Sequence, residues 1–293
     1  MTTPAPALLI AGHGTRDDAG AEAFRDFVRE LGRRNPGLPV AGGFVESSPP
    51  PLGDAVTELV GRGVSRFVAV PLTLVAAGRA KGDIPAALAR QQERHPGISY
   101  TYGRPLGPHP ALLSVLGRRL DEALGGSVRT PQDRAEVTVL LVGRGSTDPD
   151  ANAEVHRTAR LLWEGSGYAG VETAFVSLAA PDVPSGLDRC VRLGARRIVV
   201  LPYFLFAGLL PDRIQLQAEG WAAAHPEVEV RSADVVGPEP ELLDLVMDRY
   251  REATEEDRTG SARQAGLRPD DEARHLGHHQ GRHHDSHAHS HAH

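Results

Sequence analysis

Residues 7–24, ALLIAGHGTRDDAGAEAF, resemble residues 138–155, TVLLVGRGSTDPDANAEV, which lie 131 positions later in the chain. This long repeat decides the fold, because further stretches recur in the same order along the chain. They are FVESSPP with FVSLAAP, RFVAVPLTLVAAG with RIVVLPYFLFAG, and GPHPALLSVLGRRLDEA with GPEPELLDLVMDRYREA. The repeat is too long to be the unit of a solenoid, so we interpret it as a duplicated domain.

Each copy alternates apolar strands with amphipathic helices. In the first copy the pattern predicts strands at ALLIAG, LPVAGGFVE, RFVAVPLTL and ISYTYGRPL, with helices over about 19–34, 52–62, 84–95 and 109–124. Alternation of this kind is typical of a parallel sheet covered by helices on both faces. The sequence therefore predicts an α/β protein of two similar doubly wound parallel-sheet domains.

The division along the chain follows from composition. We expect a first domain at residues 1–127 that carries the active site, a second at residues 128–254, and the polar stretch GGSVRTPQDRAE as their linker. After Thr254 the sequence lacks apolar periodicity, which predicts a disordered His-rich tail over residues 255–293.

Composition excludes several classes of protein. A length of 293 residues fits about two domains, and a net charge of −6 provides no global basic field for nucleic acid. Cys190 is the only cysteine, which excludes disulfide scaffolds and Cys-based zinc fingers, and we expect it to be a small buried side chain. Since no apolar run reaches the roughly 18 residues of a membrane helix, we expect a cytoplasmic protein without nucleic-acid or membrane partners.

His13 and Glu46 are the candidate chemical residues. His13 follows the first strand on a turn flanked by glycines, and Glu46 ends the second strand; parallel sheets bind ligands at such strand ends. Ser177 replaces Glu46 in the second copy, so the carboxylate occurs only where the histidine also occurs. An imidazole with a carboxylate suits a divalent first-row metal ion. The alternatives are a structural turn histidine, a solvated or capping acid, and a phosphatase with a phosphohistidine.

Basic side chains gather near the same strand ends. Each is individually typical of a solvated or ion-paired cation, but together they could bind a polyanion through its carboxylates. They are Arg16, Arg79, Lys81, Arg104, Arg144 and Arg213. Asp83, just before Ile84 and Pro85, is expected to cap a helix.

Nine of the 14 histidines lie in residues 275–293. Neutral imidazoles bind Ni²⁺, Co²⁺, Zn²⁺ or Cu²⁺, and a tail without fixed geometry suits metal buffering better than catalysis. The lack of six consecutive histidines argues against a purification tag. The candidate buffering residues are His278, His279, His283, His284, His287, His289, His291 and His293.

Taken together, these motifs resemble the sirohydrochlorin chelatase family, the cobalt and iron class II chelatases. The matches are AGHGTRD, GFVESSPP, VPLTLVAAG with KGDIPAAL, VGRGSTDPDANAEV and LPYFLFAG, and they cover about residues 7–254. The resemblance implies two α/β lobes and insertion of a divalent metal into sirohydrochlorin, a tetrapyrrole with eight carboxylates. It also implies that His13 and Glu46 bind the metal and act in catalysis.

One position departs from the family pattern. Arg79 stands where the family has its second active-site histidine, and Leu209 stands at the matching position of the second copy. A guanidinium neither binds a divalent metal nor accepts a proton near neutral pH. Arg79 is therefore expected to weaken chelation or to bind a substrate carboxylate, alongside Arg16, Lys81 and Arg144.

We accordingly expect a lyase-type metal chelatase, a cobaltochelatase or ferrochelatase of cobalamin or siroheme biosynthesis. The divalent metal, Co²⁺, Fe²⁺ or Ni²⁺, would be a substrate rather than a fixed cofactor. The partners would be the tetrapyrrole and metal ions, and the protein would be a monomer with two lobes. The alternative is a metal-binding or metal-delivery protein whose chelatase site has degenerated.

Overall fold

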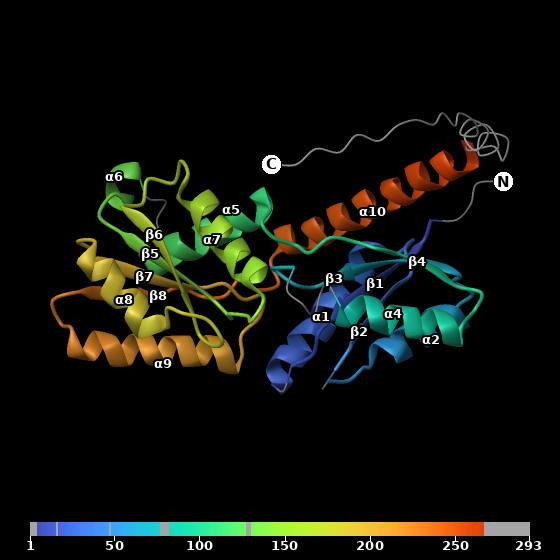
Figure 1. The fold of residues 1–293 in the computed structure, drawn as a ribbon, viewed down its shortest axis with the longest axis horizontal. Coiled ribbons are helices and arrows are strands. Elements are labelled where there is room, and N and C mark those ends of the chain that lie inside the picture. The colour runs from blue at the N-terminus through green and yellow to red at the C-terminus, as the bar shows by residue number, and fades with distance from the viewer. Residues whose placement is uncertain (1–4, 16, 47, 77–81, 127–129, 267–293) are drawn as a thin grey trace, which may run out of the picture. The chain divides into compact units, whose positions relative to one another are not determined.

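The structure is a computed structural model that describes residues 5–15, 17–46, 48–76, 82–126 and 130–266 (Figure 1). The elements of the first copy are β1 (Ala7–Gly12), α1 (Asp18–Arg34), β2 (Val40–Phe44), α2 (Leu52–Gly61), β3 (Arg66–Pro71), α4 (Asp83–Arg94), β4 (Ser99–Tyr102) and α5 (Pro110–Ala123). The linker contains α6 (Pro131–Arg134). The second copy has β5 (Thr138–Gly143), α7 (Pro149–Trp163), β6 (Gly170–Phe175), α8 (Val183–Arg192), β7 (Arg197–Pro202), α9 (Leu209–Ala224), β8 (Glu229–Ser232) and α10 (Pro240–Gly266).

The strands form two parallel sheets of four strands, ordered β2-β1-β3-β4 and β6-β5-β7-β8. The registers repeat as well: Leu8 lies opposite Val40 and Val68, and Val139 lies opposite Val171 and Val199. Strands β1 and β5 are buried along their whole length, as their uninterrupted apolar sequences predict. The fold class expected from the repeat is confirmed.

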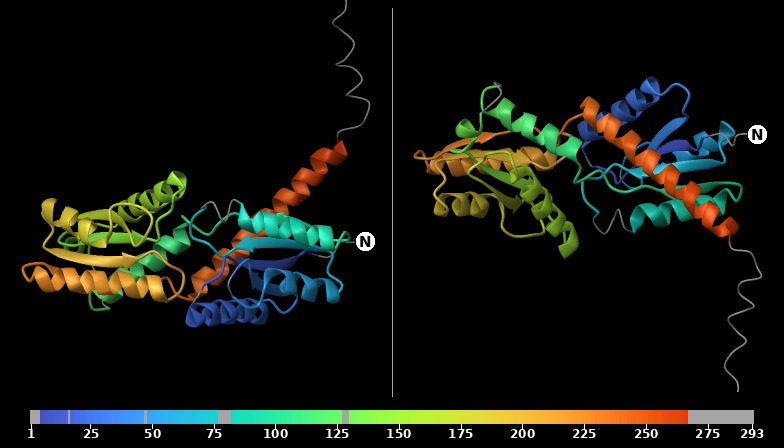
Figure 2. Two further views of the ribbon diagram at one scale, coloured as in Figure 1. Left: turned by 60° about the horizontal axis from the view of Figure 1, so that its bottom comes forward. Right: turned by 90° about the horizontal axis from the view of Figure 1, so that it is seen from above.

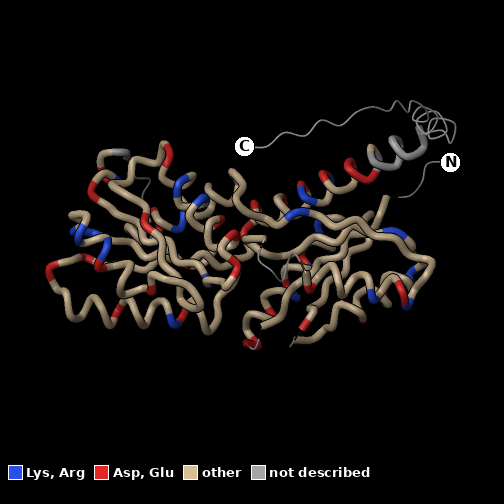
Figure 3. The backbone as a smooth tube through the Cα atoms, in the orientation of Figure 1, with Lys and Arg blue, Asp and Glu red and all other residues tan. Residues whose placement is uncertain are grey.

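Helices cover both faces of the first sheet because alternate strand residues point to opposite sides. Leu8 and its alternates pack in a core with the apolar face of α1, which includes Phe24 and Phe27. Leu9 and its alternates pack on the other side, against α2 and α4. Charged residues of both signs occur along both copies (Figure 3), whereas the buried core is almost entirely apolar.

Aspartates cap the equivalent helices in both copies. The Asp17 side chain accepts a hydrogen bond from the Ala19 N–H at the start of α1, and Asp148 accepts one from Asp150 at the start of α7. The expectation that Asp83 caps α4 is wrong. The helix starts at Asp83 itself, and its N-cap is Gly82, which has no side chain with which to cap it.

The last helix of each copy packs on the sheet of the other copy. Helix α5 contacts α7 and β7. Helix α10 lies beside the elements of the first copy (Figures 1 and 2). Its Tyr250 hydroxyl donates to the Pro6 carbonyl, and its Arg249 guanidinium donates to the carbonyls of Pro105 and Leu106. Residues 1–254 consequently form one compact unit with a core that continues through both copies.

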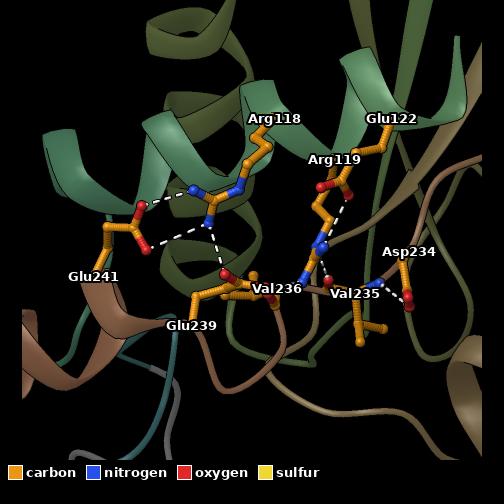
Figure 4. Close-up of polar contacts among 8 residues, drawn as sticks. All are labelled: Arg118, Arg119, Glu122, Asp234, Val235, Val236, Glu239 and Glu241. Atoms are coloured by element: carbon orange, nitrogen blue, oxygen red, sulfur yellow. Dashed lines mark hydrogen bonds and ion pairs between the residues drawn. The ribbon is translucent and has the colours of Figure 1, made fainter. Parts of the chain in front are cut away.

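Two arginines of α5 bind the segment that leads into α10 (Figure 4). The Arg118 guanidinium donates to Glu241 at 2.7 Å and to Glu239 at 2.8 Å. The Arg119 guanidinium contacts Glu239 and donates to the carbonyls of Val235 and Val236 at 2.9 and 3.0 Å. The hydrogen bond from Arg118 lowers the pKa of Glu241. These bonds join the crossover segments of the two copies.

Helix α10 continues beyond Thr254 as far as Gly266. Disorder was expected from residue 255, but the structure has helix over residues 255–266. The physical reason is intrinsic propensity, because Glu, Arg, Gln and Ala in this stretch favour helix even without an apolar stripe. Residues 267–293, with all the candidate buffering histidines, lie outside the described residues.

Candidate active site

His13 and Glu46 lie together at the carboxyl edge of the first sheet. Strands β1 and β2 are paired so that Gly12 lies opposite Phe44, and the two loops therefore leave the sheet side by side. The His13 Nε2 atom lies 3.8 Å from the Glu46 Oε2 atom. The histidine side chain is 18% exposed and the glutamate side chain is 56% exposed. The imidazole is therefore mostly buried, whereas the carboxylate is in contact with solvent.

Glycine makes the close approach of the two loops possible. The Glu46 N–H donates to the His13 carbonyl at 3.0 Å, and the Val45 N–H donates to the Gly12 carbonyl at 3.0 Å. Gly14 has φ of +122°, and a Cβ there would lie 1.8 Å from the Glu46 carbonyl oxygen. A side chain at Gly14 is therefore excluded both by backbone conformation and by space.

Ser48 ties the two loops together with its side chain. Its Oγ accepts a hydrogen bond from the Thr15 N–H at 3.0 Å and donates to the Thr15 carbonyl. In the second copy Ala179 stands at the position of Ser48, and Ser146 stands at the position of Thr15. Asn152 of α7 takes over the role of Ser48, because its side chain accepts from the Ser146 N–H and donates to the Ser146 carbonyl. Sequence reasoning missed Ser48, and the only signal was a second serine after Glu46.

The second copy reproduces the backbone of this site with different side chains. The Ser177 N–H donates to the Arg144 carbonyl at 3.0 Å, as Glu46 does to His13. Gly145 has φ of +87°, and a Cβ there would lie 1.8 Å from the Ser177 carbonyl oxygen. One copy thus presents an imidazole and a carboxylate, and the other presents a guanidinium and a hydroxyl.

The repeated architecture coincides with a known protein family. A model of the CbiX family matches residues 7–123 and again residues 138–253. The chain belongs to the CbiX family. Each match covers one copy of the repeat, so the duplication of this CbiX-family protein and the resemblance seen in its motifs are confirmed.

Curated relatives share most of the length of the chain. A sirohydrochlorin cobaltochelatase of Priestia megaterium is 35% identical over 250 residues, which are 85% of this chain and 80% of the relative. A sirohydrochlorin ferrochelatase of the same organism is 32% identical over 215 residues, 73% of this chain and 78% of the relative. The relatives therefore include enzymes named for each of two metals.

Solved structures agree with the fold. The structure of SirB from Bacillus subtilis with Fe³⁺ matches with a TM-score of 0.74 at 26% identity, over 87% of this chain and 98% of that one. The sirohydrochlorin chelatase SirB of Bacillus subtilis subspecies spizizenii in complex with cobalt matches with a TM-score of 0.71 at 26% identity, over 87% and 97%.

The structure of the CbiX-family protein describes only some of the other candidate residues. Arg144 is exposed after β5, at the position that matches His13. Arg104 forms an ion pair with Glu252 of α10 at 2.9 Å, which is the structural alternative considered for it. Arg16, Arg79 and Lys81 lie outside the described residues.

No group of three or more His, Cys, Asp or Glu side chains within the described residues is arranged to hold a metal ion. No helix in the same residues is both long and apolar enough to cross a membrane. Cys190 is fully buried, as expected, and burial raises the pKa of its thiol to about 12.

Proposed function

We propose that the protein inserts Co²⁺ or Fe²⁺ into sirohydrochlorin, as a chelatase of cobalamin or siroheme biosynthesis. The observation that carries the proposal is the 3.8 Å separation of His13 Nε2 and Glu46 Oε2 in a CbiX-family chain. The names of the relatives support both metals and do not choose between them.

His13 and Glu46 can reach one ion together. Metal bonds to imidazole nitrogen and carboxylate oxygen are about 2.1 Å long, so two such bonds span at most about 4.2 Å. The observed 3.8 Å lies within that limit. The remaining positions of the ion would be open to water and then to the pyrrole nitrogens, as the transfer of a metal substrate requires.

His13 and Glu46 can also remove the protons that metal insertion releases. Insertion of M²⁺ into the metal-free tetrapyrrole forms four bonds from metal to nitrogen and releases two protons from pyrrole N–H groups. Imidazole is a suitable acceptor near neutral pH, and the more exposed Glu46 carboxylate would pass the proton to water. The carboxylates of sirohydrochlorin would be bound by Arg144, with Arg16, Arg79 and Lys81 as further candidates.

A spectrophotometric assay tests the proposal. The full-length protein is mixed with sirohydrochlorin and either Co²⁺ or Fe²⁺ without oxygen, and loss of the metal-free spectrum is followed. His13→Ala should lower kcat by about 100-fold or more, and Glu46→Gln should lower it by a similar order. His156→Ala is the matched control, because His156 contacts Thr173 within the second copy. A wild-type rate equal to the spontaneous rate overturns the proposal.

The substitution Arg79→His tests the position that departs from the family pattern. Restoring an imidazole adds a ligand and a proton acceptor, so it should raise kcat if Arg79 marks a weakened site. A fall in activity with a rise in the KM for sirohydrochlorin would instead assign Arg79 to the substrate carboxylates.

Metal delivery with a degenerate site is the alternative function, and Arg79 together with the histidine-rich tail favours it. Deletion of residues 267–293 separates the two functions. A delivery protein should lose most of its bound metal, whereas a chelatase should keep its turnover at saturating metal. Comparison of kcat/KM for Co²⁺ and Fe²⁺ in the same protein then identifies the preferred metal.

A further inference from the structure

Large apolar side chains are exposed in the second copy. Within the described residues, the exposed members of this class are Leu161, Trp163, Leu178, Leu193, Leu209 and Leu216. Two of them, Leu178 and Leu209, stand at the carboxyl edge of the second sheet, which is the edge that carries His13 and Glu46 in the first copy. Single exposed leucines are common on protein surfaces, but these two differ from the others in lying at the strand-end edge, where parallel sheets bind ligands.

Leu178 occupies the loop that corresponds to the Glu46 loop. It follows Ser177, the counterpart of Glu46, and its side chain is 66% exposed. Its φ of +59° is in the left-handed region, which glycine and asparagine enter far more easily than leucine. The fold thus holds an apolar side chain outward at a position where a polar residue or glycine would cost less.

Leu209 is the first residue of α9 and corresponds to Arg79. Its side chain is also 66% exposed. The preceding segment packs along α1 of the first copy: Phe206 meets Phe27 edge-on at 6.0 Å, and Gly208 is so near that a Cβ there would lie 2.5 Å from Asp17 Oδ2. Leu209 therefore follows a segment that contacts Asp17, the N-cap residue of α1, which is four residues beyond His13 in the chain.

We propose that Leu178 and Leu209 form the apolar surface that holds the tetrapyrrole ring while His13 and Glu46 work on its metal. The inference rests on the proposed function and adds the site that binds the ring. A conjugated macrocycle offers apolar faces to two exposed leucines, and Leu178 follows Ser177, whose N–H donates to the carbonyl of Arg144. In this arrangement the strand-end loops of the second copy contact the ring, while the matching loops of the first copy hold the metal.

The test measures binding of metal-free sirohydrochlorin to the full-length protein by absorbance or fluorescence titration. Leu178→Asn removes the apolar side chain and suits the left-handed backbone, and Leu209→Gln keeps helix propensity at the start of α9. Each should raise the Kd for the tetrapyrrole about fivefold, as expected when the ring buries part of an otherwise solvated leucine side chain. Leu193→Asn and Leu216→Gln are matched controls from the same copy and should change Kd less than twofold.

Kinetics provide a second readout. In the Leu178 and Leu209 variants the KM for sirohydrochlorin should rise by the same factor, while kcat and the KM for the metal stay within about twofold of wild type. Equal Kd values for variants and wild type, or equal losses in variants and controls, overturn the inference while an active wild type still supports the proposed function. A wild type that binds no tetrapyrrole overturns both.

Self-association gives the last outcome. If sedimentation velocity shows that the wild type dimerises and that only Leu178→Asn and Leu209→Gln abolish the dimer, then these leucines form a contact between copies, and the inference is wrong.

Discussion

Gly14→Ala is the substitution that most directly tests the geometry of the His13–Glu46 pair. The alanine Cβ would lie 1.8 Å from the Glu46 carbonyl oxygen, and non-bonded contacts of Cβ atoms essentially never fall below 3.0 Å. One of the two loops must therefore move by about 1.2 Å. This movement breaks the hydrogen bond from the Glu46 N–H to the His13 carbonyl.

The size of the effect follows from these distances. A non-glycine residue at φ of +122° is strained by about 1–3 kcal/mol, and the lost hydrogen bond contributes about 1 kcal/mol. We expect the free energy of unfolding to fall by about 3 kcal/mol, roughly 6–12 °C in Tm for a unit of this size. A shift of about 1.2 Å added to 3.8 Å takes the ligand pair past the span of about 4.2 Å that two metal bonds reach. Misplacement of this size typically costs about 100-fold in kcat.

Gly145→Ala is the matched control. Its Cβ would lie 1.8 Å from the Ser177 carbonyl oxygen, so the steric conflict and the loss of stability should be similar. The second copy contains no counterpart of the ligand pair, so kcat should stay within about threefold of wild type. The KM for the tetrapyrrole should rise several-fold, because the loop that carries Leu178 moves.

Thermal unfolding and steady-state chelation of Co²⁺ are measured for both variants at a temperature where each is folded. The proposed role of the His13–Glu46 geometry is refuted if the two variants lose kcat by the same factor, or if Gly14→Ala keeps the wild-type kcat.

Three further predictions concern other parts of the chain. Ser48→Ala removes the side chain that joins the two loops and should lower kcat about tenfold, whereas Asn152→Ala in the second copy should leave kcat within twofold; the chelation assay measures both. Because burial raises the Cys190 pKa to about 12, a thiol reagent at pH 8 should not label the native protein and should label it fully in guanidinium chloride. Arg118 lowers the pKa of Glu241, so their ion pair stabilises the fold above the ordinary carboxyl pKa of 4.5 and loses this effect as pH falls through the lowered value. Glu241→Gln should therefore lower Tm slightly at pH 7, and its difference from wild type should shrink in melts at successively lower pH.

The elements and the candidate pair could be predicted because their signals are local. Strand β1 is an uninterrupted apolar run, and the chain returns to it at a fixed offset. Once the strands are parallel, residues just after neighbouring strands must share an edge, and this rule places His13 near Glu46. The Asp83 error is also local, because a capping aspartate and a first-turn aspartate differ by one residue in the same sequence.

Long-range pairings could not be predicted in the same way. The apolar faces of α5 and α10 show that each helix packs on a sheet, but a period of 3.6 residues does not say which sheet. The exposure of Leu178 and Leu209 could not be predicted either, since a leucine near a strand end is usually buried in the core. Ser48 carried only the weak signal of a second serine after Glu46, because its role depends on a backbone group 33 residues away.

The exchange of helices gives the second copy a structural role although it lacks counterparts of His13 and Glu46. The buried face of α5, which includes Leu112, Leu116 and Leu120, belongs by sequence to the first copy but packs with the second. Removing the second copy would expose this face and would also remove α10 from the first sheet, so neither copy has a complete core of its own. The fold of the first copy therefore depends on the second copy whatever the loops of the second copy contain. Its strand-end loops can therefore carry different side chains on the same backbone, as the pairs His13 with Arg144 and Glu46 with Ser177 show.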